Sequence, residues 1–301
     1  METQLTVVIV IVTFNVKELT RNCLNSLKNL TIPAKIIVSD NGSSDGTVEM
    51  VKKEFPNVLL LDNKYNLGFA KGNNRARKYC KGKYVLILNP DTVVEKGTIE
   101  ECVKYIKRDE KLGALTCKIE LWSGGLDKDS RRSFPTPWVA LTHFSFLDRV
   151  FPKSKLFARY WYGFISKDEI HEIDVPQGAF FLVKKEVMDK IGWYDEDYFL
   201  DGEDIDIAYR IKQLDYKIIY YPKVKIIHYK GASKGKKVSG FQNTISPQTR
   251  KQAISSGMDS MKIFYKKHFL KKYPWLVSKL VFSGIGIIKT IRLLKYNIAH
   301  N

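Results

Sequence analysis

Carboxylates are concentrated in the segment "DEDYFLDGEDIDIAYRI", residues 195–211. Asp201, Glu203, Asp204 and Asp206 place four of them within six residues, around the predicted start of a helix over residues 203–214. Acidic residues stabilise a helix N-terminus through its dipole, so part of this pattern has a structural explanation. Four acids exceed what a cap requires, and their mutual repulsion favours proton binding by at least one. The segment therefore predicts a general base.

Small polar residues follow three predicted strands. Asn89-Pro90-Asp91 ends the apolar run Tyr84–Leu88, while Thr13-Phe14-Asn15 and Ser39-Asp40-Asn41-Gly42 end two earlier runs. Each group by itself is compatible with ordinary turn chemistry. The carboxyl ends of parallel strands meet at one edge of a sheet, where ligands of open α/β sheets bind. Their coincidence predicts a polar rim that holds a nucleotide.

The segment "NLGFAKGNN", residues 66–74, places Gly68 and Lys71 at the predicted start of a helix. Free backbone N–H groups at such a start can bind phosphate, and both residues are close in sequence to the rim. The segment is neither a GxGxxG fingerprint nor a Walker lysine motif, which weakens NAD and ATP as candidate ligands.

Strands alternating with helices predict an α/β fold with a parallel sheet. The expected strands are 5–13, 34–40, 57–62, 84–89 and 112–121, and the expected helices are 16–30, 47–55, 70–80 and 95–108. Residues 123–174 are interpreted as a long irregular region. A strand running into a short helix is expected over 178–192, followed by a helix over 203–214, two strands, "YKIIYYP" and "VKIIHY", a loop over 231–247, and helices to the end.

Seven motifs, in order, give the sequence a family resemblance. They are "VTFN" (12–15), "VSDNGSSDGT" (38–47), "NLGFAKGNN" (66–74), "LNPDT" (88–92), "GAFFLVKKEV" (178–187), "GWYDEDYFLDGEDIDIAYRI" (192–211) and "IIHYKGAS" (226–233). The sequence resembles family 2 inverting glycosyltransferases over about residues 5–233, in particular a rhamnosyltransferase-like branch. The resemblance implies the GT-A nucleotide-diphospho-sugar-binding fold, with a mostly parallel central sheet.

The resemblance assigns a metal site to Asp91, which stands at the final acid of the family's DxD motif. Asn89 replaces the first acid, as is usual in this branch. Mg²⁺ or Mn²⁺ would bind the diphosphate there, since hard cations take oxygen ligands. His228 matches a histidine that completes the metal site in some relatives, although a lone histidine ending a strand is also commonly structural.

The resemblance also assigns the reaction groups. Asp204 matches the catalytic base, and Glu203 would orient it or bind the acceptor. Asp40 would contact the nucleotide base or ribose. The other residues expected on the nucleotide sugar are Thr13, Asn15, Asn41, Gly68, Lys71 and Asn89. Transfer would be a single in-line displacement, in which a carboxylate accepts the proton of the acceptor hydroxyl.

The resemblance suggests dTDP-rhamnose as donor, with UDP-hexoses as the alternative, and a saccharide or lipid-linked acceptor in cell-surface polysaccharide synthesis. Two hypotheses of other classes stay open: a catalytically inactive assembly partner, and a nucleic-acid-binding protein. Neither is favoured, because both acidic motifs are intact and no base-reading motif is present. The four cysteines show no metal-type spacing and are interpreted as reduced core thiols of a cytosolic protein.

The charge of the chain is uneven. Of the formal net charge of +18, almost all lies in residues 216–301, where 18 Lys and Arg accompany one acid, Asp259. Residues 275–296 are apolar but interrupted by basic residues, which predicts an amphipathic helix at a lipid interface rather than a span. We therefore expect a catalytic domain over 1–247 and a basic helical extension over 248–301. The enzyme would lie peripherally on the cytoplasmic face of the cell membrane.

Overall fold

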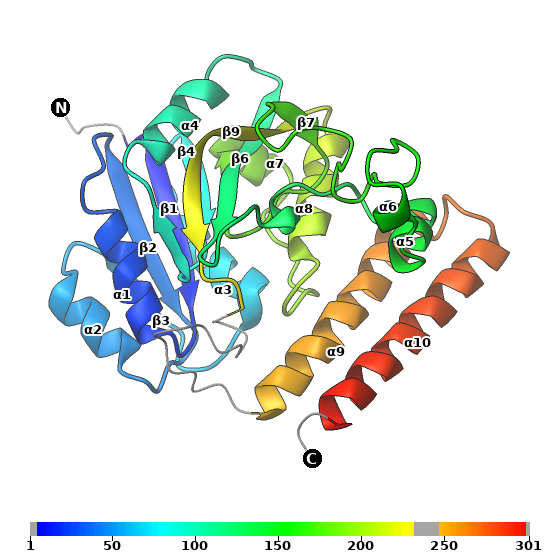
Figure 1. Ribbon diagram of the computed structural model, residues 1–301. Helices are drawn as coiled ribbons and strands as arrows, with labels where there is room; N and C mark the ends of the chain where they lie inside the picture. Colours follow the sequence, from blue (N-terminus) through cyan, green and yellow to red (C-terminus); the bar gives the residue numbers. More distant parts are fainter. Residues whose placement is uncertain (1–4, 232–246, 299–301) are drawn as a thin grey trace.

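The computed structural model describes residues 5–231 and 247–298. Its centre is a nine-stranded sheet with strand order β3-β2-β1-β4-β8-β6-β9-β5, and β7 also pairs with β9. The strands are β1 (Val7–Thr13), β2 (Ala34–Asp40), β3 (Leu59–Asp62), β4 (Tyr84–Leu88), β5 (Thr92–Val94), β6 (Leu112–Leu121), β7 (His171–Ile173), β8 (Phe180–Lys184) and β9 (Lys217–His228). The helices α9 (Pro247–Phe264) and α10 (Trp275–Ile298) lie side by side at one end of the molecule, with the short helices α5 (Pro137–Phe144) and α6 (Leu147–Val150) beside them (Figure 1). The other helices lie around the sheet (Figure 1).

The first half of the sheet has the predicted alternation. β1 pairs in parallel with β2 and β4, and β2 pairs in parallel with β3. The connecting helices are α1 (Lys17–Ser26), α2 (Thr47–Glu54) and α3 (Gly68–Ala76), the last extended by the 3₁₀ turn η1 (Arg77–Tyr79). β1 and β4 are buried almost throughout, as apolar runs covered on both faces should be. This half brings the ends of β1, β2 and β4 to one edge.

The second half of the sheet is mixed. β8 is antiparallel to both β4 and β6, while β6 is parallel to β9. The prediction of two strands over 216–229 was wrong, because β9 is one strand. Its pairing with β6 shifts register between Cys117 and Lys118, opposite the stretch that contains Pro222. Proline cannot donate to the ladder, so the strand continues past it with a bulge. The helices here are α4 (Thr98–Ile106), α7 (Lys185–Lys190) and α8 (Glu203–Gln213).

Residues 123–174 contain more regular structure than predicted. They form the 3₁₀ turn η2 (Lys128–Ser130), the helices α5 (Pro137–Phe144) and α6 (Leu147–Val150), and β7. The start of α5 is well specified, since the Thr136 side chain accepts a bond from the Val139 N–H and Pro137 occupies the first turn. Its apolar residues do not follow a clear helical period, and its aromatic and proline content favoured a loop.

The C-terminal helices are α9 (Pro247–Phe264), the π-helical turn η4 (Tyr265–Phe269) and α10 (Trp275–Ile298). Phe264, Tyr265 and Phe269 form a buried cluster with Tyr198 and Tyr209 of the α8 region. The His268 Nε2 atom lies 2.7 Å from the Asp206 Oδ1 atom of α8. The beginning of this extension is therefore packed against the rest of the fold. The predicted boundary at 247/248 falls at the start of α9 and adjoins residues outside the described part of the chain. The predicted loop over 231–247 lies outside that part apart from Gly231 and Pro247.

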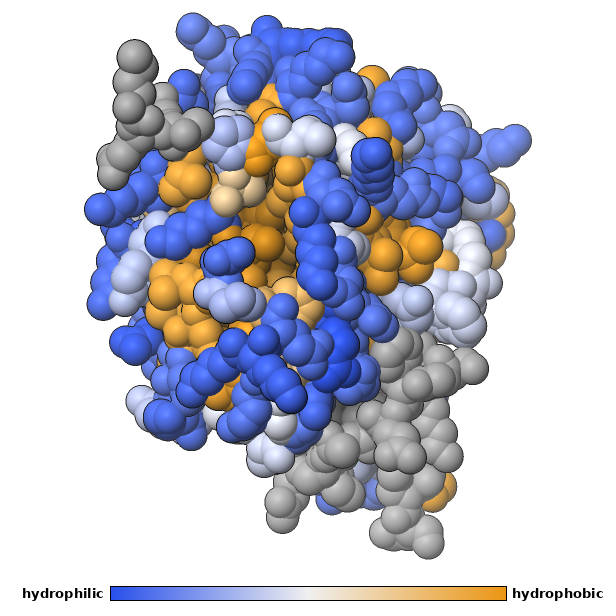
Figure 2. Space-filling model, turned by 90° about the vertical axis from the view of Figure 1, so that its left-hand side faces the viewer, coloured by the Kyte–Doolittle hydropathy of each residue, from blue (hydrophilic) through white to orange (hydrophobic). Residues whose placement is uncertain are grey.

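The four cysteines are free and buried, as predicted for core thiols. Burial raises the pKa of the Cys23 and Cys80 thiols to about 12. Within the described residues, none of the helices combines the length and the hydropathy needed to cross a bilayer. The side of the molecule away from α9 and α10 is mostly hydrophilic at its edges, and hydrophobic residues show between hydrophilic ones towards its centre (Figure 2).

Candidate active site

A cavity of about 360 Å³ lies where the ends of β1 and β4 meet the start of α8. Its lining includes eight of the residues predicted from the sequence, which are Thr13, Asn41, Gly68, Asn89, Asp91, Glu203, Asp204 and His228. The end of the sheet thus brings the proposed metal residues and the proposed base to a single cavity.

Asp91 and His228 are brought together by strand pairing. Thr92 of β5 is the register partner of His228 in β9, and the Tyr229 N–H donates to the Asp91 carbonyl at 2.8 Å. The His228 Nε2 atom lies 3.3 Å from the Asp91 Oδ1 atom. The other ring nitrogen, Nδ1, lies 3.0 Å from the Asp127 Oδ2 atom, so the imidazole is held between two carboxylates.

This arrangement fits a divalent cation. A histidine ligand held from behind by a carboxylate is a recurrent feature of metal sites. Burial lowers the pKa of His228, but the charges of Asp91 and Asp127 outweigh it and raise the pKa to about 9. A metal ion would have to displace that proton. The described residues contain no group of three or more potential His, Cys, Asp or Glu ligands, so a bound ion would need further ligands, for which the oxygen atoms of a diphosphate are suited.

The acidic segment begins α8 at the same cavity. Gly202 has a left-handed backbone with φ of 87°, and α8 starts at the next residue, Glu203. The Asp204 carboxylate forms an ion pair with Arg132, whose guanidinium also donates to the Pro176 carbonyl at 3.1 Å. Both side chains are largely buried. Arg132 therefore holds Asp204 in a defined position within the cavity wall.

Sequence reasoning missed a charged network that supports both sides of the cavity. The network consists of Asp127, Asp129, Arg132 and Lys230. Within it, Lys230 forms ion pairs with both Asp127 and Asp129. Burial would raise the pKa of Asp129, but Arg132 and Lys230 lower it to about 2. The alternation of acids and bases over residues 127–132 was a signal, although it fell within the segment interpreted as irregular.

Asp40 lies at the end of β2 but does not line the cavity. Its carboxylate accepts bonds from the Thr13 hydroxyl at 2.9 Å and from the Ser43 N–H at 2.8 Å. Asn15 accepts a bond from the Ser44 N–H at 2.7 Å. The loops after β1 and β2 are therefore fastened to each other, and the nucleotide contact predicted for Asp40 and Asn15 stays a prediction.

Asn41 and Gly68 connect the rim to α3. The Asn41 side chain donates to the Gly68 carbonyl at 3.0 Å. Gly68 has φ of 79°, and an added Cβ atom would lie 2.4 Å from the Phe199 carbonyl oxygen. Only glycine fits this close approach, which brings the start of α3 against the loop before α8.

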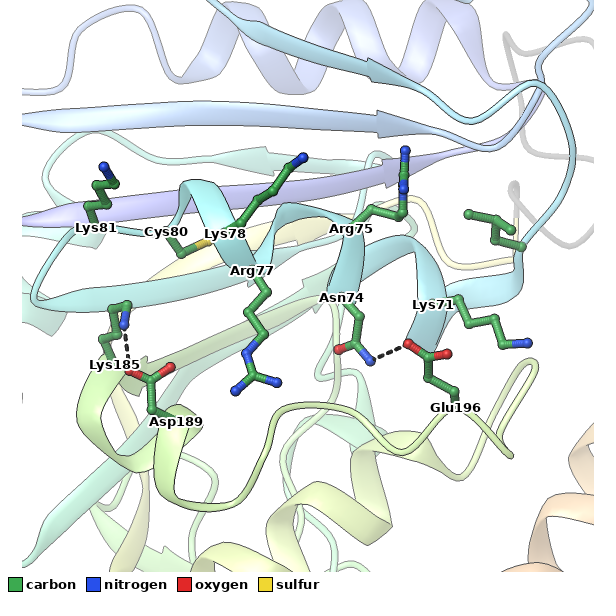
Figure 3. Close-up of a pocket in the computed structure, with 11 residues that line it drawn as sticks. Lys71, Asn74, Arg75, Arg77, Lys78, Cys80, Lys81, Lys185, Asp189 and Glu196 are labelled. Atoms are coloured by element: carbon green, nitrogen blue, oxygen red, sulfur yellow. Dashed lines mark hydrogen bonds and ion pairs between the residues drawn. The ribbon is translucent and has the colours of Figure 1, made fainter.

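Lys71 lies elsewhere. Its side chain belongs to the lining of a separate pocket of about 830 Å³, shared with Asn74, Arg77 and Glu196 (Figure 3). The Asn74 side chain donates to the Glu196 carboxylate there at 2.9 Å. Lys71 is not among the residues that line the cavity at the start of α8. Its placement one turn into α3 gives the predicted phosphate contact no support.

The sequence was compared with known families and proteins. Residues 8–192 match the model of the family described as glycosyl transferase family 2. An N-acetylglucosaminyl-diphospho-decaprenol L-rhamnosyltransferase of Mycobacterium tuberculosis is 27% identical over 219 residues, which cover 68% of this chain and 69% of the relative. A poly-beta-1,6-N-acetyl-D-glucosamine synthase of Staphylococcus epidermidis is 26% identical over 213 residues, covering 70% of this chain and 46% of the relative.

Solved structures share the fold. A mannosyltransferase from Pyrobaculum calidifontis, solved in complex with GDP-Man and Mn²⁺, superposes with a TM-score of 0.55 at 17% identity. The match covers 95% of this chain and 81% of that one. S. aureus TarS 1-349 in complex with UDP-GlcNAc gives a TM-score of 0.51 at 16% identity, covering 85% of this chain and 66% of that one. These likenesses support the predicted GT-A fold.

Proposed function

The chain is a glycosyltransferase that belongs to glycosyl transferase family 2, and we propose that it catalyses a metal-dependent, inverting transfer of L-rhamnose from dTDP-rhamnose. The acceptor is a hydroxyl of a saccharide or lipid-linked glycan in cell-surface polysaccharide synthesis. The choice of sugar and acceptor is supported by the name of the mycobacterial relative. A UDP-hexose is the alternative donor, and the S. aureus neighbour solved with UDP-GlcNAc is the observation behind it.

The observation that carries the proposal is the meeting of Asp91 and His228 with Glu203 and Asp204 in one cavity. Asp91 and His228 would hold Mg²⁺ or Mn²⁺. When bound, the ion would offset the negative charge that develops on the departing nucleotide diphosphate. Two protein ligands leave several coordination positions for phosphate oxygens, so the donor and the metal would bind together.

Asp204 would act as the general base. A sugar hydroxyl is a weak nucleophile, so a carboxylate must accept its proton as the new glycosidic bond forms. Arg132 holds this carboxylate and is a positioning residue. Glu203, the adjacent acid, would orient the acceptor. Because attack on the anomeric carbon and departure of the diphosphate occur in one displacement, the configuration at that carbon would be inverted.

The test is a panel of sugar nucleotides with Mn²⁺. Thermal-shift binding should be largest for dTDP-rhamnose and should vanish with a chelator. Transfer to an N-acetylglucosaminyl-diphospho-lipid should then release dTDP. Stabilisation by UDP-hexoses alone would replace the donor assignment with its alternative. If no nucleotide sugar binds in the presence of metal, the proposed function is wrong.

A further inference from the structure

A second cavity, of about 540 Å³, forms an apolar groove between α5, α9 and α10. The residues that characterise it are Pro137, Trp138, Leu141, Phe264, Val281 and Ile285. Ser260 is a rare polar residue in its lining, and no charged residue contributes to it. A lining of this kind favours a hydrocarbon ligand over a sugar or a nucleotide. In Figure 1, α5 and α6 lie beside the end of the α9–α10 pair.

The groove shares a wall with the catalytic cavity. Gly202 and Ile205 line the groove, whereas Glu203 and Asp204, which lie between them in sequence, line the catalytic cavity. A single turn at the start of α8 therefore separates the groove from the catalytic cavity. A molecule whose apolar part lies in the groove would bring its polar end close to the proposed base.

The groove is open to solvent along an apolar edge. Leu141 is 58% exposed and Leu280 is 67% exposed, although both line the groove. Exposed apolar side chains clustered at a cavity indicate a binding surface. The four Lys and Arg of α10 do not belong to the lining, and Lys289 is paired with Asp259 of α9. The lining and its exposed edge are therefore complementary to a hydrocarbon chain.

We propose that this groove binds the hydrocarbon chain of a polyprenyl-linked acceptor and thereby holds the acceptor sugar at Asp204. The inference rests on the proposed function, since it requires a lipid-linked acceptor. The groove binds the chain, and the shared turn at Gly202 directs the sugar into the catalytic cavity. Selection for lipid-linked acceptors is then a property of α5, α9 and α10, not of the catalytic cavity.

Two glycines of α10 provide a matched test. Gly284 lines the groove and Gly286 does not. A Cβ atom added at either position meets no atom within 4 Å, so both accept a side chain without a clash at that atom. Gly284→Leu should fill the groove, while Gly286→Leu gains the same helix propensity outside it. Thermal unfolding of both variants confirms that they are folded.

The first measurement is equilibrium binding of farnesyl phosphate to the full chain, with inorganic phosphate as the head-group control. We expect wild type and Gly286→Leu to bind farnesyl phosphate with the same affinity, and Gly284→Leu to bind it about tenfold or more weakly. Inorganic phosphate should bind all three equally weakly. Unchanged binding of farnesyl phosphate by Gly284→Leu would overturn the proposal.

The second measurement separates the acceptor chain from membrane lipid. Binding to phosphatidylglycerol vesicles should be the same in Gly284→Leu and Gly286→Leu. If Gly284→Leu loses vesicle binding while its affinity for farnesyl phosphate is retained, the groove accommodates bilayer lipid and the proposal is wrong. Sugar-nucleotide binding with Mn²⁺, measured in parallel, reports on the proposed function alone. If no sugar nucleotide binds while farnesyl phosphate binds normally, the groove is still a hydrocarbon-binding site, but its role in holding a glycosyl acceptor is refuted.

Discussion

Asp91 differs from a simple strand-end residue because it is buried beside His228. An alanine there would leave a cavity and remove one of the two carboxylates beside the imidazole, so asparagine is the better probe. We expect Asp91→Asn to weaken Mn²⁺-dependent donor binding by more than about a hundredfold, since even supporting partners of metal ligands are worth about 10–100-fold. Calorimetric titration of dTDP-rhamnose with and without chelator measures this.

Asp62 provides the control for Asp91. It ends β3 and is the register partner of Asp40, but it does not line the catalytic cavity. Asp62→Asn should bind the donor as wild type does. Full metal-dependent binding by Asp91→Asn would show that the cation lies elsewhere.

Replacing Asp204 is expected to lower the turnover rate and to leave the affinity for the donor unchanged. Asparagine is nearly isosteric and still accepts a bond from Arg132, but it cannot take up a proton at neutral pH. We expect Asp204→Asn to lower kcat by about a hundredfold to ten-thousandfold with an unchanged donor dissociation constant. Steady-state kinetics and titration with the donor check the two quantities separately. Asp197→Asn, in the same segment but exposed and paired with Lys267, is the control.

A weaker donor affinity in Asp204→Asn, with kcat close to that of wild type, would contradict the assignment. The residue would then belong to the donor site, and the base would have to be sought among the other acids of the cavity, such as Glu203 and Asp129.

At the scale of elements, the turn η4 connects the extension to the catalytic fold. Phe269 is 4% exposed and packs in the cluster with Tyr209 and Tyr265, whereas its neighbour Leu270 is 44% exposed. Phe269→Ala should lower the free energy of unfolding by about 3–5 kcal/mol, because a buried aromatic ring is removed and a cavity is left. Leu270→Ala should change it by less than about 0.5 kcal/mol.

Denaturant titration of the two variants measures the difference. Equal effects would mean that η4 does not pack on α8 in solution. A deletion that removed the extension from residue 262 onward would take Phe264 and Phe269 out of the cluster, so it would destabilise the fold as well as remove α10. Substitutions on the outer surface of α10 avoid this loss.

At the scale of the whole molecule, apolar and basic residues coincide on α10. Trp275 is 74% exposed and Ile298 is 78% exposed, and no acidic side chain lies on this helix. An exposed apolar surface with basic residues is typical of helices at a lipid interface. We expect the double variant Lys279→Glu/Lys295→Glu to lose most binding to anionic vesicles, with each reversal removing about 1 kcal/mol or more of attraction.

The control is Lys52→Glu/Lys53→Glu, which makes the same change in net charge at exposed positions of α2. Vesicle sedimentation at low and high salt compares the variants, and high salt should weaken binding of the wild type. Equal losses in both double variants would indicate attraction by net charge alone, and the interfacial role of α10 would be refuted.

The sequence by itself determined the parallel half of the sheet and the family resemblance. Buried parallel strands have long apolar runs, and local polar residues mark their ends, so the order of residues in the chain was enough to place Thr13, Asn41 and Asp91 at one edge of the sheet. The acidic residues at the start of α8 are also neighbours in the sequence. These features depend on neighbouring residues in the chain, and such signals can be recognised in a single sequence.

Only the tertiary structure decided which distant residues complete the site. Asp127 reaches His228, and Arg132 reaches Asp204, across separations of 101 and 72 residues. Lys71, which is close in sequence to the rim, lines another pocket because a helix turns successive side chains in different directions. The apolar groove also needs α5, α9 and α10 together, and no period in any one of them encodes their contact. Long-range packing sets these positions, so local patterns could not predict them.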